Sequence, residues 1–453
     1  MAETARSESA DGELPFRQSI DGVLESTIGE HGLTAAELHG WLERLQPAID
    51  QLRHAWHSKT FPLLSICEET DDIVAAEQAL ATLTEGARTL VFFGTGGASL
   101  GGQALAQLGG WDIPGSAPED QKQKPRTRFY DNLDAHTLAR VLATLDLAST
   151  RFVVTSKSGN TPETLVQALA AIDAVKQSGL AAQLPRLFLG ITEPSGPDRR
   201  NGLRDVFEAH GIPLLDHHPG IGGRYSVLTN VGVVPALARG LDVRALRVGA
   251  RDVISTLLSA STPRQILPAL GAAVNVALAK ERGVDVSVLI PYSDRLGRFA
   301  HWYVQLWSES LGKSGEGTTP IACVGPVFQH SQLQLFMDGP RRHLLTVLRP
   351  ATTGVGPRID LDLAEMAGIG EMAGRTAGDL IAAEAQGVVD ALADVGRPVR
   401  LIEMNRLDER TLGALLMHFM LETILASQLL GVDPFDQPAV ELGKALSRKW
   451  LLG

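Results

Sequence analysis

The amino-acid sequence predicts an α/β protein with two parallel-sheet domains, an N-terminal helical segment and a C-terminal helical tail. The 453 residues are enough for two or three domains. Short apolar runs recur along the chain, and each leads through a turn into a stretch with helical periodicity. This alternation is typical of parallel strands that are joined by right-handed crossovers.

The first segment, residues 1–85, is predicted to be helical. Thr34 and Glu37 have the spacing of a capping box, in which the two residues satisfy each other's backbone N–H groups. The following stretch, LHGWLERLQPAIDQL, has apolar residues at helical spacing.

The first sheet domain is predicted over residues 86–245. Its expected strands are TLVFFG at 89–94, RFVVTS at 151–156 and RLFLGIT at 186–192. The first two lead into glycine-containing turns and then helices, as the crossover pattern requires.

The second sheet domain is predicted over residues 246–431, followed by a tail at 432–453 that is expected to pack on the body. Gly431 is a plausible stop for the long helix TLGALLMHFMLETILASQLL that ends this domain. The expected strands lie at 286–292, 321–326, 343–349 and 397–404.

Composition excludes several classes of protein. The net charge of −11 and the lack of a dense Lys/Arg run argue against a nucleic-acid partner. No apolar run reaches the ~18 residues of a membrane helix, and the N-terminus does not resemble a secretory signal. Cys67 and Cys323 form neither a disulfide framework nor a metal-ligand cluster, so a reducing cytoplasm is the simplest setting.

SKSGNTPET, residues 156–164, is the strongest local candidate for an anion site. It follows a predicted strand and opens a helix, with Thr161 at the N-cap and Pro162 at the first helical position. Ser156, Ser158 and Thr161 add hydroxyl groups to the free N–H groups of the helix start. An ordinary capped turn would have a similar composition, so the phosphate interpretation and the structural one stay open here.

GTGGASLGG, residues 94–102, is a second glycine-rich turn after a strand. It does not fit a dinucleotide fingerprint because Ser99 occupies the place of the third glycine. SLGKS at 310–314 is not a nucleotide-binding P-loop because residue 307 is Trp. The glycines at 94–97 are expected to let the backbone approach a ligand closely.

Four side chains elsewhere are candidates for chemistry. Arg224 follows paired glycines, and Glu309 is expected at the C-terminal end of a helix, where the macrodipole disfavours a carboxylate. His330 follows a predicted strand end. Three of them have an ordinary alternative. Arg224 could be a solvated arginine, His330 a structural histidine and Lys444 a solvated helix lysine.

Taken together, five stretches resemble the glucose-6-phosphate isomerase (phosphoglucose isomerase) family in its shorter prokaryotic form. In chain order they are SKSGNTPET, GGRYSVLTNVG, WSESLGK, QHSQLQLF and GVDPFDQPAVELGKAL. The resemblance runs from about residue 89 to 446. It implies two sugar-isomerase (SIS) domains with flavodoxin-like sheets, a homodimer with the active site at the subunit interface, and a role in glycolysis and gluconeogenesis without a metal or redox cofactor.

The resemblance also implies roles for individual residues. Glu309 would be the base that moves the proton, and Arg224 would stabilise the enediolate. His330, from the other subunit, would assist ring opening, and Lys444 would either help ring opening or hold the sugar oxygens. The residues expected to bind the substrate or its phosphate are Gly97, Ala98, Ser156, Lys157, Ser158, Thr161 and Gln437.

Two positions depart from the family pattern. Ala98 stands where a serine commonly contacts substrate, and Asn160 stands where a threonine is common. These differences leave the fine contacts and the sugar preference open, but not the reaction class.

Three other functions are weighed against this one. A related sugar-phosphate isomerase that also accepts mannose 6-phosphate would differ in its response to a panel of hexose phosphates. A SIS module that only binds a sugar phosphate as a regulator would not need Glu309, His330 and Lys444. A dinucleotide-dependent dehydrogenase is disfavoured by Ser99 and would bind a nicotinamide cofactor.

Overall fold

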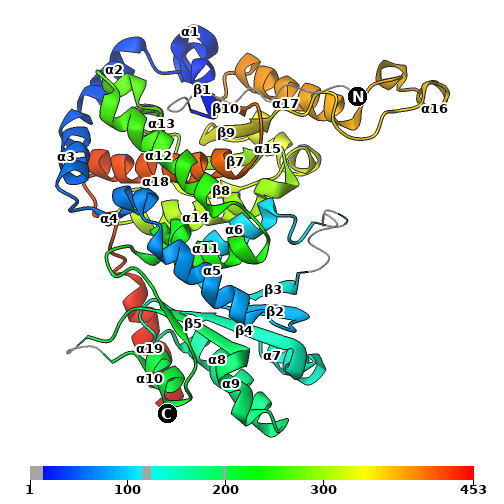
Figure 1. Ribbon diagram of the computed structural model, residues 1–453. Helices are drawn as coiled ribbons and strands as arrows, with labels where there is room; N and C mark the ends of the chain where they lie inside the picture. Colours follow the sequence, from blue (N-terminus) through cyan, green and yellow to red (C-terminus); the bar gives the residue numbers. More distant parts are fainter. Residues whose placement is uncertain (1–13, 114, 116–123, 197–199, 453) are drawn as a thin grey trace.

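The computed structural model describes residues 14–113, 115, 124–196 and 200–452 of the chain. Two five-stranded sheets form separate layers, with helices around each (Figure 1). The predicted α/β class is confirmed, because strands and crossover helices alternate along both halves.

The first sheet has the strand order β3-β2-β4-β5-β6, and all its strands are parallel. This is the flavodoxin-like order, in which successive strands are added first on one side of β2 (β3) and then on the other side (β4, β5, β6). Its strands are β2 (Thr89–Phe93), β3 (Arg126–Tyr130), β4 (Thr150–Thr155), β5 (Phe188–Thr192) and β6 (Leu214–Asp216). The accompanying helices are α6 (Leu100–Leu108), α7 (Ala135–Thr144), α8 (Pro162–Gln177), α9 (Leu184–Leu187), α10 (Gly202–Ala209) and α11 (Asn230–Ala238).

The second sheet has the order β1-β10-β9-β7-β8, and its last four strands are parallel. These strands are β7 (Val286–Pro291), β8 (Thr319–Ala322), β9 (His343–Pro350) and β10 (Val399–Met404). The helices are α12 (Val243–Ser259), α13 (Leu267–Arg282), α14 (Gly297–Leu311), α15 (Leu333–Asp338), α16 (Leu361–Met366), α17 (Ala377–Asp394) and α18 (Glu409–Leu430).

The N-terminal segment is not wholly helical. Strand β1 (Phe16–Ser19) pairs antiparallel with β10 and so covers one edge of the second sheet. The predicted helical character holds for most of the described segment, and β1 is an addition that the sequence analysis missed because a four-residue edge strand is too short to show alternation. The Thr34–Glu37 capping box is present at the start of α2. The segment's helices are α1 (Glu25–Ile28), α2 (Ala35–Glu43), α3 (Gln46–His57), α4 (Pro62–Ser65) and α5 (Asp71–Leu83), and residues 1–13 lie outside the described part.

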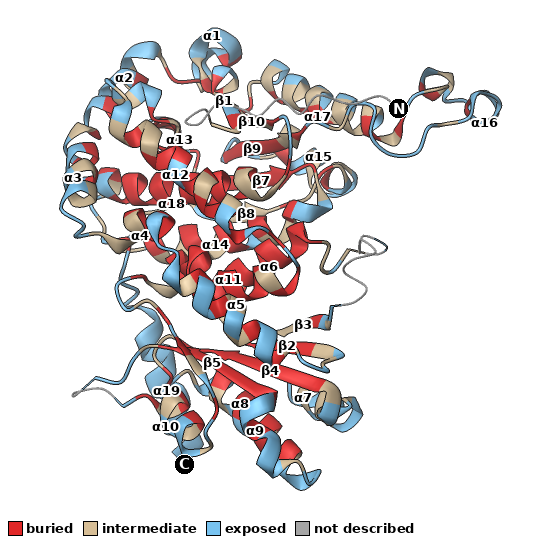
Figure 2. Cartoon of the chain, viewed as in Figure 1, coloured by how far each residue is buried: buried red, intermediate tan, exposed pale blue. Residues whose placement is uncertain are grey.

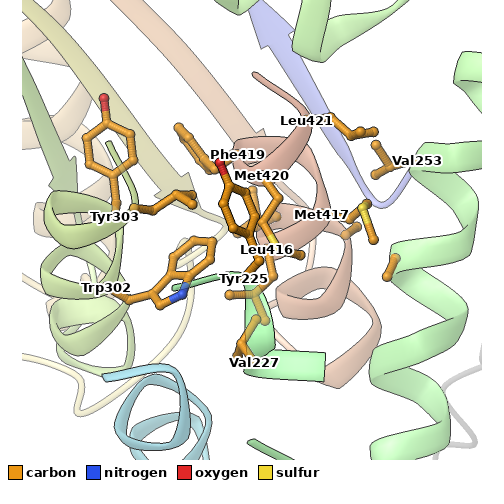
Figure 3. Packing of buried hydrophobic residues seen from close by; sticks show 14 of the residues in the cluster. Tyr225, Val227, Val253, Trp302, Tyr303, Leu416, Met417, Phe419, Met420 and Leu421 are labelled. Carbon is orange, nitrogen blue, oxygen red and sulfur yellow. The ribbon is translucent and has the colours of Figure 1, made fainter. Parts of the chain in front are cut away.

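The predicted division between residues 245 and 246 falls inside α12, and it stays a prediction. One hydrophobic core runs between the two sheets and includes residues of α6, α11, α12, α14 and α18. Figure 2 shows this buried centre, and Figure 3 shows side chains such as Trp302, Phe419 and Leu416 packed within it. The two sheets are therefore held together by shared packing.

Helix α18 lies in the middle of this core. It ends at Gly431, whose φ of 70° is left-handed, as the sequence predicts. Among the described helices it alone is long and apolar enough to cross a membrane, and 94% of that stretch is buried within the protein. The helix is thus packed as a core helix.

Two parts of the chain extend away from the core. The segment that carries α16 projects from the second domain, and its Leu361, Leu363 and Met366 are exposed (Figure 1). Helix α19 (Val440–Leu452) forms the tail, and none of its residues is buried. Close packing of the tail helix on the body is therefore not seen in the single chain.

Candidate functional site

The two glycine-rich turns lie next to each other at the carboxyl ends of the strands of the first sheet. They follow β2 and β4, the neighbouring strands between which the chain order reverses. In open α/β sheets the crevice beyond the carboxyl ends of such strands is where ligands bind. Both turns predicted from the sequence therefore belong to one site.

The turn after β4 has the geometry expected of an anion site. Thr161 is the N-cap residue of α8 and Pro162 follows at the first helical position, but no side chain caps the helix start. Instead, Ser156 Oγ donates to Thr161 Oγ1 at 3.1 Å. The exposed end of the helix therefore keeps its backbone donors for a ligand.

Gly159 is required by this turn. Its φ is +64°, and an added Cβ would lie 1.6 Å from Asn201 Oδ1. Ser158 Oγ accepts a hydrogen bond from the backbone N–H of Asn160 at 3.2 Å. The turn is thus held in shape by its own side chains and by the start of α10.

Two further polar groups lie at the turn. Lys157 Nζ is 3.4 Å from Glu193 Oε1, so its charge is shared with a neighbouring carboxylate. Thr164, in the first turn of α8, has a buried hydroxyl without a hydrogen-bond partner among the described residues. The sequence analysis missed Thr164, although its position one turn into the helix was a usable signal.

The turn after β2 connects the anion site to Arg224. A Cβ on Gly94 would lie 3.1 Å from Thr155 O, at the end of β4. A Cβ on Gly97 would lie 2.6 Å from the backbone nitrogen of Arg224. A side chain would be tightly placed at Gly94 and would clash at Gly97, so glycine lets these backbone segments come together. The expected close approach of a ligand to these glycines stays a prediction.

Ala98 and Ser99 end this turn. Ser99 is buried, and its Oγ accepts a hydrogen bond from Gln103 Nε2 at 2.8 Å. The Ser99 oxygen is therefore engaged by a side chain of α6, and Ser99 itself is buried.

Arg224 and Glu309 form the charged pair of the site. Arg224 Nη1 lies 3.2 Å from Glu309 Oε2, although the residues are 85 apart in sequence. Only 6% of the Arg224 side chain is exposed, compared with 31% for Glu309. The guanidinium is therefore fixed, while the carboxylate can be reached by a small molecule.

Glu309 lies in the last turn of α14, as predicted, where the macrodipole disfavours its charge. Its second oxygen, Oε1, accepts from Gln305 Nε2 at 3.0 Å. Gln305 also approaches the first glycine turn, since a Cβ on Gly96 would lie 2.8 Å from Gln305 Nε2. The sequence analysis missed Gln305, although its spacing four residues before Glu309 places both on one helix face.

Arg224 is oriented by more than Glu309. Its Nε donates to Ser310 Oγ at 2.9 Å, and Nη1 also donates to Gln437 Oε1 at 2.9 Å. Ser310 Oγ is in turn 3.0 Å from the hydroxyl of Tyr225. Burial raises the pKa of Tyr225 to about 12, so this phenol stays protonated. Gln437 is thus brought to the site, and Ser310 was missed by the sequence analysis.

A cavity of about 470 Å³ opens beside this pair. It lies between the end of α14 and the chain that leaves α18, and Glu309 contributes to its wall. Residues lining it include Ser308, Glu309, Lys313, Asp433, Asp436 and Gln437. A group of three or more His, Cys, Asp or Glu side chains suited to a metal is not found in the described part of the chain.

Within one chain, His330 and Lys444 do not contact the Arg224–Glu309 pair through any hydrogen bond or ion pair between described residues. His330 is exposed on a short 3-10 turn, Val327–His330, after β8. Lys444 lies on α19, where its Nζ pairs with Glu441 at 2.7 Å and its side chain is 60% exposed. No ion pair joins Lys444 to Glu309 in the described residues, so the roles implied for both residues stay predictions.

Comparison with known proteins identifies the family of this chain. The family model for phosphoglucose isomerase matches residues 71–335. A glucose-6-phosphate isomerase of Rubrobacter xylanophilus is 33% identical, with 92% of this chain and 94% of the relative aligned. A probable glucose-6-phosphate isomerase of Methanococcus maripaludis is 31% identical, over 98% of this chain and 95% of the relative.

A solved structure has the same overall fold. The crystal structure of a hypothetical protein from Thermus thermophilus matches with a TM-score of 0.81 and 29% identity, over 97% of this chain and all of that one. The match of the family model over residues 71–335 and the aligned relatives show that the chain belongs to the phosphoglucose isomerase family.

Proposed function

We propose that this protein is a glucose-6-phosphate isomerase, which interconverts glucose 6-phosphate and fructose 6-phosphate. The observation that carries the proposal is the Arg224–Glu309 pair at 3.2 Å, joined through the Gly94–Ala98 turn to the anion site after β4. An aldose–ketose isomerase needs a base, a fixed positive charge and a phosphate anchor within one substrate length, and we assign these parts to Glu309, Arg224 and the turn after β4.

The turn 156–161 holds the phosphate in this proposal. The uncapped start of α8 offers backbone N–H groups, and the macrodipole favours a negative charge there. Ser156, Ser158 and Thr161 supply hydroxyls, and the partnerless Thr164 hydroxyl lies one turn further. Lys157 adds a positive charge that Glu193 partly neutralises.

Glu309 moves the proton. Its carboxylate takes the proton from C2 of the open-chain aldose, and the electron pair passes through a cis-enediolate to the C1 oxygen. Glu309 then returns the proton to C1, while the hydroxyl proton moves from O2 to O1, so that C2 becomes the carbonyl carbon. Arg224 stabilises the negative charge of the enediolate, and its five donors hold it in place before the charge develops.

Ring opening requires an acid and a base in addition. We assign it to His330 of the partner subunit and to Lys444, in a homodimer that shares its active sites. The exposure of His330 supports an intermolecular role. Exposed apolar side chains on the α16 segment and on α19, among them Met366, Trp450 and Leu451, support burial against a second copy.

The same proposal places the protein in the cytoplasm, in glycolysis and gluconeogenesis. Its partners would be the sugar phosphate and its own second copy. The net charge of −11 supports the absence of a nucleic-acid partner.

The direct test is an assay of fructose 6-phosphate conversion, coupled to detection of glucose 6-phosphate, without added metal. Turnover by the wild type is expected. Binding of the sugar phosphate without turnover would instead favour a regulatory SIS module. Mannose 6-phosphate, tested in the same way, sets the substrate range.

Sharing of the active site is tested by mixing two inactive variants. Glu309→Gln and His330→Ala dimers are dissociated, mixed in equal amounts and reassociated. A hybrid dimer would contain one intact site, so the mixture should regain about a quarter of wild-type activity. If activity does not return although hybrids form, His330 does not act across the interface.

A further inference from the structure

The turn that links α18 to α19 is built as a defined structure beside Arg224. Asp433 Oδ1 accepts a hydrogen bond from the backbone N–H of Phe435 at 2.8 Å, which closes the turn. The ring of Phe435 packs against Phe61 and Tyr225, with centroids 5.6 and 5.4 Å apart. We call residues 433–437 the tail turn.

The tail turn supplies most of the hydrogen bonds that orient Arg224. Every N–H group of the guanidinium has an acceptor, so its orientation is fully determined. The five acceptors are Ser310 Oγ, Glu309 Oε2, Gln437 Oε1, Pro434 O and Asp436 O. Three of these belong to the tail turn, and the shortest contact, to Pro434 O, is 2.6 Å.

A second cationic side chain, Lys313, also binds the tail turn. Lys313 Nζ lies 2.6 Å from Asp436 Oδ1 and also donates to the carbonyl oxygen of Asp433. Its side chain is 12% exposed, whereas Asp436 is 52% exposed. Lys313 lies two residues beyond the end of α14, the helix that carries Glu309.

We propose that Lys313 is a positioning residue for the isomerase reaction. It fastens the tail turn to the end of α14, so that the carbonyls of Pro434 and Asp436 and the amide of Gln437 hold Arg224 toward Glu309. The proposal rests on the function proposed above. Small displacements of reacting groups are costly, since a misplacement of about 1 Å can reduce the rate about 10²-fold.

An ordinary alternative is that Lys313 only complements the negative end of α14. A lysine in that role needs no partner on the tail turn and would be solvated. Lys313 is largely buried and has two acceptors on that turn. Lys280 is a suitable contrast, because it pairs with Glu316 at 2.6 Å but is 42% exposed.

The test compares Lys313→Met with Lys313→Arg and with Lys280→Met as the matched control. For Lys313→Met we expect kcat to fall about 10- to 100-fold, with KM for fructose 6-phosphate within about twofold, because the phosphate turn is untouched. Hydrogen exchange of the backbone amides of Phe435, Asp436 and Gln437 should become faster. Lys313→Arg should recover most of the activity, and Lys280→Met should resemble the wild type.

Asp436→Ala provides an independent variant that removes the same contact from the other side. It should reproduce the loss in kcat, and combining it with Lys313→Met should add little further loss. Unchanged kcat in folded Lys313→Met or Asp436→Ala protein would overturn the proposal, as would a loss that Lys280→Met shares. An inactive wild type would contradict the proposed function instead, and the exchange data would still report whether Lys313 holds the tail turn.

Discussion

Two arginine–glutamate pairs occupy opposite environments in this protein. In the first, Arg224 meets Glu309 at the edge of a cavity, and the carboxylate side chain is 31% exposed. In the second, Arg400 of β10 meets Glu422 of α18 in the core, where their side chains are 1% and 0% exposed. The same two residue types thus form a site and a structural anchor.

The core pair is satisfied entirely from within. Arg400 Nη1 lies 2.9 Å from both carboxylate oxygens of Glu422, and Asn275 Nδ2 donates to Oε1 at 3.0 Å. Asn275 Oδ1 accepts from Ser287 Oγ, which also contacts the Tyr303 hydroxyl. His418 Nε2 is 3.0 Å from Oε2, but its orientation is not that of a hydrogen bond. A ligand has no access to this carboxylate.

In the site pair, only the arginine has all its hydrogen-bonding groups occupied. Arg224 has all its acceptors, but each oxygen of Glu309 has a single donor, Arg224 at 3.2 Å or Gln305 at 3.0 Å. Glu309 therefore keeps lone pairs for a substrate proton. The comparison shows that burial and the number of donors, more than residue type, distinguish the proposed catalytic carboxylate of Glu309 from the structural carboxylate of Glu422.

The largest effect is expected for Glu309→Gln. Removing the base should lower kcat by about 10³–10⁴-fold. The free energy of unfolding should change by no more than about 1 kcal/mol, because the side chain is partly exposed and Arg224 keeps its other acceptors. Steady-state assays and urea unfolding measure the two quantities, and near-wild-type turnover would remove Glu309 from its role.

Glu422→Gln should show the opposite behaviour. It leaves the buried Arg400 charge without its partner, which typically costs about 3–5 kcal/mol of folding stability. Turnover per folded molecule should stay within a few-fold of the wild type. If Glu422→Gln instead lowered kcat as much as Glu309→Gln does, the two pairs would not differ as described.

Arg224→Lys should lower kcat about 10²–10³-fold, because an ammonium group keeps the charge but lacks the planar fork. Arg400→Lys is the matched change in the core, and we expect it to reduce stability with little effect on kcat. Assays of both variants at matched folded concentration measure this. An unimpaired Arg224→Lys enzyme would show that the guanidinium geometry is not needed.

Lowering the pH should gradually reduce the folding stability that depends on Glu422 and His418. Burial lowers the pKa of His418. Burial alone raises the pKa of Glu422, but interactions led by the Arg400 charge outweigh it, and the pKa lies below its ordinary value. Because both groups bind protons more readily when unfolded, stability should be full above about pH 6.5 and decline as pH falls through 6.5 and then below about 4.3. Urea unfolding across this range should show a shallower decline at the acid end for Glu422→Gln, and equal declines would contradict the assignment.

Local patterns could be predicted from sequence because neighbouring residues determine them. Thr161 at a helix start and Gly431 at a helix end are such cases. Contacts between distant residues, such as Arg224 with Glu309 or Lys313 with the tail turn, depend on how the two sheets pack. The resemblance to a family supplied the first of these, but no sequence pattern indicated the second.

The short strands β1, β3 and β6 were also missed, for a related reason. Arg126–Tyr130 has the sequence RTRFY, whose first three residues are charged or polar, and Leu214–Asp216 is only three residues long. Such segments become strands because longer neighbours offer hydrogen bonds at the sheet edge. Packing of the α19 helix was expected from its apolar residues, but that helix has no buried residue in the single chain.

The most direct test of the account is a crystal structure of Glu309→Gln with bound glucose 6-phosphate. The account predicts the phosphate at the 156–161 turn, and C1 and C2 of the sugar between the amide of residue 309 and the Arg224 guanidinium. A sugar phosphate bound at that turn with its carbons directed away from both residues would contradict it.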